Sequence, residues 1–252
     1  MDVSSNVWTF SVPGCILRLM LMLLLALPLA APSPATLEQW SVRSAAIEQQ
    51  VMGRPAVPTR GPASILVEPV AGSPISVSNG LIHHWKGSLY VMGVRVPQVV
   101  QAMQRYDDLA RYYSPDVVES KLLAHDGDHY RVLLRMREHE VITARLSTIA
   151  EVHYGGTDKD HQWSISHIDS VRDESGEDHG FLWRMNTYWH FTQQPDGVVL
   201  ECEVVSLTRD VPTGLNWLIR PFLRSIPEKS LRFTLERTKQ MLMEAHDGNR
   251  RN

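Results

Sequence analysis

A run of strand-like segments followed by one long amphipathic helix constrains the fold of this 252-residue chain more than any other feature. Six consecutive segments alternate apolar and polar residues, and turn residues such as Asp126–Gly127 and Pro195–Asp196–Gly197 separate neighbouring segments. Strands joined by such short turns pair antiparallel. One further strand precedes them, so the predicted strands span residues 81–92, 117–124, 128–137, 140–153, 161–171, 180–193 and 197–208.

Helical patterns interrupt and then end this run. Residues 97–113 have helical spacing with Pro97 at the start, and Asp107–Asp108 divide them into two predicted short helices. After Pro212 we expect a short helix over residues 214–226, interrupted by Pro221, and a long helix to about residue 245. One stripe of the long helix is formed by Leu231, Leu235, Thr238 and Leu242. Since the apolar face of a large sheet must be covered, we predict an α+β domain whose curved antiparallel sheet wraps this helix.

These segments resemble the helix-grip fold of the START-like (SRPBCC) superfamily, which includes polyketide cyclases/aromatases, pollen-allergen-like proteins and coenzyme Q-binding proteins. The likeness lies closest to an exported bacterial subgroup and covers about residues 80–242. It is carried by residues 80–85 (GLIHHW), 106–115, 180–189, 207–212 and 217–231. The resemblance implies a hydrophobic ligand cavity between the sheet and the C-terminal helix. It transfers no catalytic residue to this chain.

The N-terminal segment predicts export. Residues 16–31 (ILRLMLMLLLALPLAA) are too short for a transmembrane helix and are followed by small residues and prolines, as in a signal peptide. We therefore expect a signal peptide over residues 1–31 and a periplasmic or extracellular protein, with an uncleaved membrane anchor as the alternative. Residues 32–79 should hold a helix (36–52), a proline-rich linker and a strand (64–70). The domain should span residues 80–246, with a disordered tail at 247–252.

Period-2 alternation suggests which side chains face the interior. We expect Phe181, Trp183, Met185 and Trp189 to share the inward face of one strand, with Leu200 and Val204 opposite them across a hairpin, and Trp163 and His167 inward on another strand. The resulting candidate ligand-binding set is Trp163, His167, Phe181, Trp183, Met185, Trp189, Leu200, Val204, Trp217 and Leu235. Plain core packing is the alternative for the aromatic residues, and a core or rim histidine is the alternative for His167.

Several classes of function are disfavoured. A net charge of −3 with scattered basic residues argues against nucleic-acid binding. No HExxH, CxxC, glycine-rich phosphate loop or G-x-S-x-G is present, so we expect no metal, no cofactor and no catalytic set. Cys202 fits a buried, inert thiol. Arg184, on the opposite face from the aromatic residues, is expected to pair with Glu201 or Glu203.

The expected partner is a hydrophobic small molecule or lipid, carried by a non-enzymatic exported binding protein. Two other functions stay open. One is a cyclase/aromatase-type enzyme, with His167 or a tyrosine as acid–base. The other is a structural or interaction protein with a filled core. The amphipathic stretch around Trp217 is expected either to form a lid or to touch a membrane transiently.

Overall fold

The computed structural model describes residues 31–54, 64–138, 144–173, 176, 182–210 and 216–251. The order of elements is α2 (Pro34–Met52), β1 (Leu66–Pro69), β2 (Ile75–Val77), β3 (Gly80–Met92), α3 (Val96–Met103), η1 (Tyr106–Asp108), α4 (Leu109–Tyr112), β4 (Val117–Asp126), β5 (His129–Glu138), β6 (Ala144–Asp158), β7 (His161–Asp173), β8 (Leu182–Gln194), β9 (Gly197–Arg209) and α5 (Asn216–Arg251). The predicted strand run, the short helices before it and the helix after it are confirmed.

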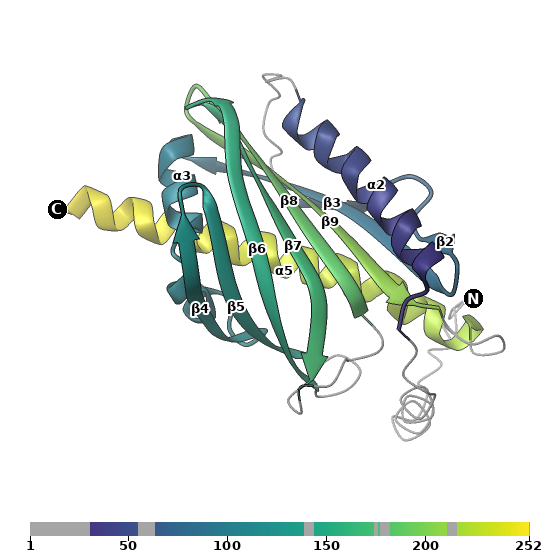
Figure 1. Cartoon of the computed structure of the whole chain (residues 1–252). Coiled ribbons are helices and arrows are strands. Elements are labelled where there is room, and N and C mark those ends of the chain that lie inside the picture. Colours follow the sequence, from purple (N-terminus) through teal and green to yellow (C-terminus); the bar gives the residue numbers. More distant parts are fainter. Residues whose placement is uncertain are drawn as a thin grey trace, which may run out of the picture.

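A single antiparallel sheet of nine strands forms the centre of the molecule. Its strands follow the order β1-β3-β9-β8-β7-β6-β5-β4, and β2 pairs with β3 as well. The six consecutive strands β4 to β9 form the expected meander, and β9 closes it by pairing with β3 along its length. The sheet curves around α5, which runs across its inner face (Figure 1). This architecture is the predicted helix-grip arrangement.

The sheet has apolar side chains on both faces and two separate cores. The inner core joins the concave face to α3 and α5, through residues such as Leu200, Cys202 and Leu235. The outer core lies on the convex face, where Val205 and Leu207 of β9 pack with Trp40 and other residues of α2. Along β9, the even-numbered residues therefore pack in the inner core and the odd-numbered residues pack in the outer core.

Helix α2 covers part of the convex face, opposite α5 (Figure 1). Its first turn is capped because the Ser33 hydroxyl accepts a hydrogen bond from the Thr36 amide, 3.1 Å away. Trp40, Ile47 and Val51 recur at helical spacing and are 6%, 6% and 2% exposed. The helix itself was predicted. Its role as a second cover for the sheet was not, because a half-buried sheet seemed to need only the C-terminal helix.

The end of the chain differs from prediction in two ways. One continuous helix, α5, replaces the two predicted helices, so neither Pro221 nor Pro227 ends it. It also continues to Arg251, so most of the tail that was expected to be disordered is helical. The predicted stripe is confirmed where side chains are described, since Leu231, Leu235 and Leu242 are almost fully buried. Among the described helices, none is long and apolar enough to cross a bilayer.

Candidate ligand-binding interior

Half of the predicted ligand-binding residues do face the interior. Trp189 and Leu200 belong to the inner core, and the side chains of Met185 and Val204 pack against it from β8 and β9. Leu235 reaches the same core from α5 and is 0% exposed. These residues come together because β8 and β9 pair directly, with Trp189 opposite Cys202. The interior is therefore apolar where α5 crosses the sheet.

Three predicted residues lie on the other side of the sheet. Trp183 belongs to the outer core, and Trp163 packs against that core. His167 shares the convex face and its Nε2 lies 2.8 Å from the Glu48 carboxylate of α2. The expectation that these three line the interior is wrong. Trp163, Ile165 and His167 do share a face, as predicted, but that face is covered by α2.

A bulge at the start of β8 explains the position of Trp183. Leu182 pairs with Thr208 and Arg184 with Leu207, so the register shifts by one residue between them. A bulge places two residues of one strand opposite a single residue of its partner and breaks the alternation. Trp183 consequently turns to the convex face, while Met185 and Trp189 beyond the bulge face inward.

Two predicted residues cannot be placed. Phe181 lies outside the residues that the structure describes, and Trp217 lies in α5 at a position where the side chain is not described. The assignment of either residue to the ligand site stays a prediction.

Gly87 sets how closely α5 approaches the sheet. It pairs with Cys202 in the middle of β3, and a Cβ atom at this position would lie 2.5 Å from Cδ1 of Leu235 and 3.3 Å from Leu231. A contact below 3.0 Å requires movement, so a larger residue at this position would displace the Leu235 side chain or the helix that carries it. Helix α5 and strand β3 are therefore in direct contact at this crossing.

Tyrosine side chains bring hydroxyl groups into the inner core. The hydroxyl oxygens of Tyr106 and Tyr154 are 2.9 Å apart, and the hydroxyl of Tyr113 is 2.7 Å from that of Thr238 on α5. The rings of Tyr106 and Tyr154 also pack on Tyr130 of β5. Burial raises the pKa of Tyr106, Tyr154 and Tyr113, in the last case to about 12, so all three are neutral hydrogen-bonding groups at neutral pH.

A pocket of about 300 Å³ opens at the same end of the sheet. It lies between the end of α3 and the β6–β7 hairpin, and its lining includes Val100, Gln104, Asp128, Tyr154, Asp158 and Gln162. Tyr154 therefore belongs both to the inner core and to the wall of this pocket.

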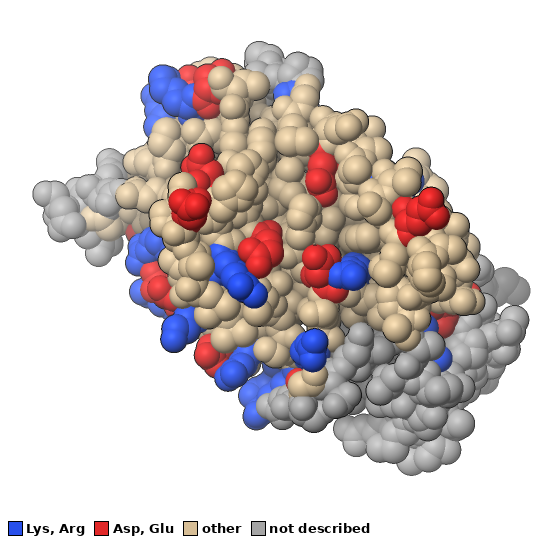
Figure 2. Space-filling view, in the orientation of Figure 1, with Lys and Arg blue, Asp and Glu red and all other residues tan. Residues whose placement is uncertain are grey.

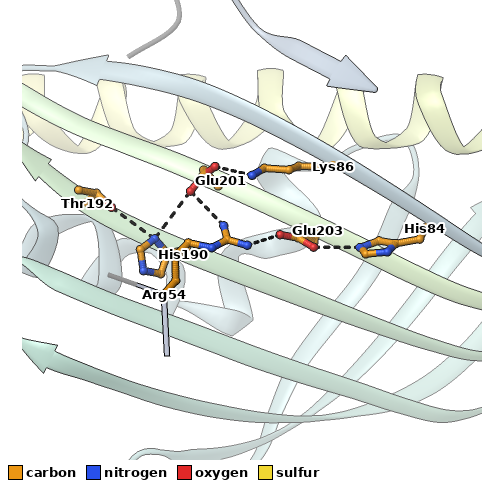
Figure 3. Close-up of polar contacts among 7 residues, drawn as sticks. All are labelled: Arg54, His84, Lys86, His190, Thr192, Glu201 and Glu203. Atoms are coloured by element: carbon orange, nitrogen blue, oxygen red, sulfur yellow. Dashed lines mark hydrogen bonds and ion pairs between the residues drawn. The ribbon is translucent and has the colours of Figure 1, made fainter. Parts of the chain in front are cut away.

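The convex face carries a partly buried polar cluster next to the end of α2 (Figure 3), which we call the Arg54 cluster. Arg54 follows the helix directly and lies between two carboxylates of β9, with 3.0 Å to Glu201 and 2.5 Å to Glu203. His84 and Lys86 of β3 contact Glu203 and Glu201 from the other side, at 2.9 and 2.7 Å. The Arg54 cluster is a poor candidate for a ligand-binding site, because its acidic and basic side chains already form ion pairs with one another.

The pKa of Glu203 reflects these contacts. Burial alone would raise it, but the hydrogen bonds and charges of His84 and Arg54 outweigh burial and lower the pKa to about 2. The expectation that Arg184 pairs with Glu201 or Glu203 is wrong. Arg184 binds Asp169 of the neighbouring strand instead, at 2.7 Å, because the register of β8 and β9 places Arg184 opposite Leu207, four residues along β9 from Glu203.

Within the described ranges, no group of three His, Cys, Asp or Glu side chains is arranged to hold a metal ion. Cys202 is buried, and burial raises the pKa of its thiol well above the usual range, which opposes formation of the reactive thiolate. Acidic and basic side chains are interspersed on the face shown in Figure 2, without a region of one sign.

Sequence reasoning missed the tyrosines. Tyr154 continues the inward alternation of Ala150 and Val152, but the strand was predicted to end at His153. Tyr106 belonged to a predicted helical stripe and was not considered a polar group of the interior. The sequence signal that could have identified Tyr154 is the alternation of apolar residues over 150–154, which continues one residue beyond the predicted end of the strand.

Comparisons with known proteins bear on the fold. No protein-family model matches the sequence, and no curated protein sequence matches it. Among solved structures, the STAR-related lipid transfer protein from Xanthomonas axonopodis is 17% identical, with 73% of this chain and 97% of that chain covered and a TM-score of 0.53. Human STARD10 is 8% identical, with 82% and 81% covered and a TM-score of 0.55. On the evidence of its sheet order, its C-terminal helix and these two structures, the chain has the START-like helix-grip fold.

Proposed function

We propose that this chain is an exported, non-enzymatic binding protein for a hydrophobic small molecule or lipid, held between the concave face of the sheet and α5. The observation that carries the proposal is the composition of that interior. Leu200, Val204, Met185 and Leu235 present apolar surface from three elements, and tyrosine hydroxyls supply a few polar groups at one end. Apolar walls with a few placed polar groups are typical of small-molecule sites.

The placement of His167 supports binding over catalysis. It was the one histidine considered for acid–base work, and its Nε2 faces Glu48 under α2 rather than the interior. The interior tyrosines are poor bases because burial raises their pKa. General acid–base catalysis needs a titratable group near the reacting atoms whose pKa lies close to the working pH. These groups do not meet that requirement.

The sequence of the N-terminus supports export. Residues 1–31 have the short apolar run and small-residue region of a signal peptide. An exported carrier of a hydrophobic molecule would load and unload at a membrane, and the Trp217 to Leu223 stretch has the amphipathic composition for a transient contact there.

Native mass spectrometry of the protein beginning at Pro32 tests the proposal, followed by extraction of bound small molecules. We expect a mass above that of the polypeptide, or uptake from a bacterial lipid extract. Two variants at adjacent positions provide the control. Met185→Trp fills the inner face and should reduce uptake, whereas Arg184→Trp changes the convex face and should not. A bare polypeptide mass without uptake from the extract would favour the filled-core alternative.

A further inference from the structure

The two hydroxyl pairs of the interior differ in how their hydrogens are used. Each hydroxyl carries one hydrogen to donate and two lone pairs to accept. The Thr238 hydroxyl donates to the backbone carbonyl of Thr234, 2.8 Å away, so the Tyr113 hydroxyl must be the donor to Thr238. Both hydrogens of this pair are therefore in hydrogen bonds. The hydrogen bonds from Tyr113 to Thr238 and from Thr238 to Thr234 therefore leave no hydroxyl hydrogen of this pair for a ligand.

The Tyr106–Tyr154 pair keeps one hydrogen unused. A single hydrogen bond joins the two hydroxyls, and only one of them can be its donor. Among the residues that the structure describes, neither hydroxyl makes another hydrogen bond. The two side chains are only 7% and 5% exposed. A buried donor without an acceptor costs free energy, and native proteins usually supply a partner.

We propose that the hydroxyl of Tyr154 donates this remaining hydrogen to an acceptor oxygen of the bound hydrophobic ligand. Tyr154 is the member of the pair that is among the residues around the pocket beside α3, whereas Tyr106, on η1, is not. Tyr106 then donates to Tyr154 and orients its hydroxyl. The inference rests on the proposed function and adds the ligand's polar group to it.

The pocket also restricts the charge of that polar group. Its described lining includes the carboxylates of Asp128 and Asp158 and neither Lys nor Arg. A ligand carboxylate or phosphate would be repelled there, because like charges at short range oppose binding. A neutral carbonyl, as in a ketone or an ester, accepts the hydrogen bond without this penalty. The ligand class is therefore an uncharged apolar molecule with an acceptor oxygen, such as a carbonyl oxygen, at one end.

Two naphthalene probes of nearly equal shape test the assignment. 2-Acetylnaphthalene carries a carbonyl acceptor and 2-ethylnaphthalene does not, and equilibrium dialysis measures the affinity of the protein for each. One net hydrogen bond in a buried site corresponds to about three- to tenfold in affinity. We expect the wild-type protein to prefer the acetyl probe by that factor. The ratio of the two affinities corrects for differences in folded fraction among variants.

Tyrosine-to-phenylalanine variants then identify the donor. Tyr154→Phe should abolish the preference, whereas Tyr106→Phe should retain it, because the Tyr154 hydrogen is still available. Tyr113→Phe is the matched control and should behave as the wild type. Equal binding of both probes by the wild type would overturn the donor assignment but leave the proposed function standing.

Other outcomes are equally decisive. A preference that survives in Tyr154→Phe would overturn the assignment, as would one lost equally in Tyr106→Phe. Binding of neither probe by the wild type would count against both this inference and the proposed function. Tighter binding of 2-naphthoate than of 2-acetylnaphthalene would overturn the restriction to uncharged ligands.

Discussion

Replacing Gly87 tests the contact that holds α5 against the sheet. The Cβ atom of alanine would lie 2.5 Å from Cδ1 of Leu235, a side chain that is 0% exposed and belongs to the inner core. Overpacking of a core costs about 1–3 kcal/mol, and replacing glycine within a strand returns about 0.5–1 kcal/mol. We therefore expect Gly87→Ala to lower the free energy of unfolding by about 1–2 kcal/mol. Gly87→Val should lower it further.

Urea denaturation followed by tryptophan fluorescence measures this change, at constant m-value. Gly248→Ala is the control, because a Cβ at that position of α5 meets nothing within 4 Å. The decisive comparison is a double-mutant cycle. Leu235→Ala alone should cost about 2–5 kcal/mol, and Gly87→Ala should cost nothing further in that background because its clash has been removed. Strict additivity of the two changes, or a fully stable Gly87→Ala, would refute the packing argument.

Three further predictions concern the convex face. The pKa of Glu203 is about 2 in the folded protein against 4.5 for an unperturbed glutamate, so its stabilisation is complete above pH 4.5 and is lost as the pH falls towards 2. Glu203→Gln should flatten that part of a stability–pH curve, by on the order of 3 kcal/mol, while Glu151→Gln at an exposed ion pair should leave it unchanged. Arg54→Met should lower stability by about 1 kcal/mol in the same denaturation assay, since its contacts are partly exposed; no change would mean that α2 is held by its apolar residues alone. Trp183→Phe should cost about 1–2 kcal/mol yet leave the affinity for 2-acetylnaphthalene within about twofold, and a larger loss of affinity would contradict the outward placement of this side chain.

The order of elements was predictable because local rules determine it. Asp126–Gly127 and Pro195–Asp196–Gly197 mark tight turns, and the change from period 2 to helical spacing after Pro212 marks the final helix. The continuity of α5 was not predictable in the same way. Proline disfavours a helix interior, and the sequence does not show whether neighbouring contacts compensate for it.

The direction in which a strand faces was harder to predict than the strand itself. Alternation groups residues into two faces, but it does not say which face meets α5. For β7 the grouping of Trp163 with Ile165 was right and the side was wrong, because α2 supplies a second apolar cover. For β8 a bulge changed the phase after Leu182, and nothing in the residue types announces it. Which residues of a strand face inward, and which helix packs on each face of the sheet, both depend on contacts between segments that are distant in the sequence.

The position of α2 divides the sheet into two mechanically different halves. Strands β3, β9, β8 and β7 lie between α2 on one side and the inner core on the other. Among the described residues, the outer core includes none from β4, β5 or β6, and the side chains of Leu123 and Ile149 are 44% and 38% exposed. A layer packed on both faces resists deformation more than one packed on a single face. A change in the volume of the interior would therefore cost less at β4 to β6, next to the tyrosine pair, than in the half that is packed on both faces.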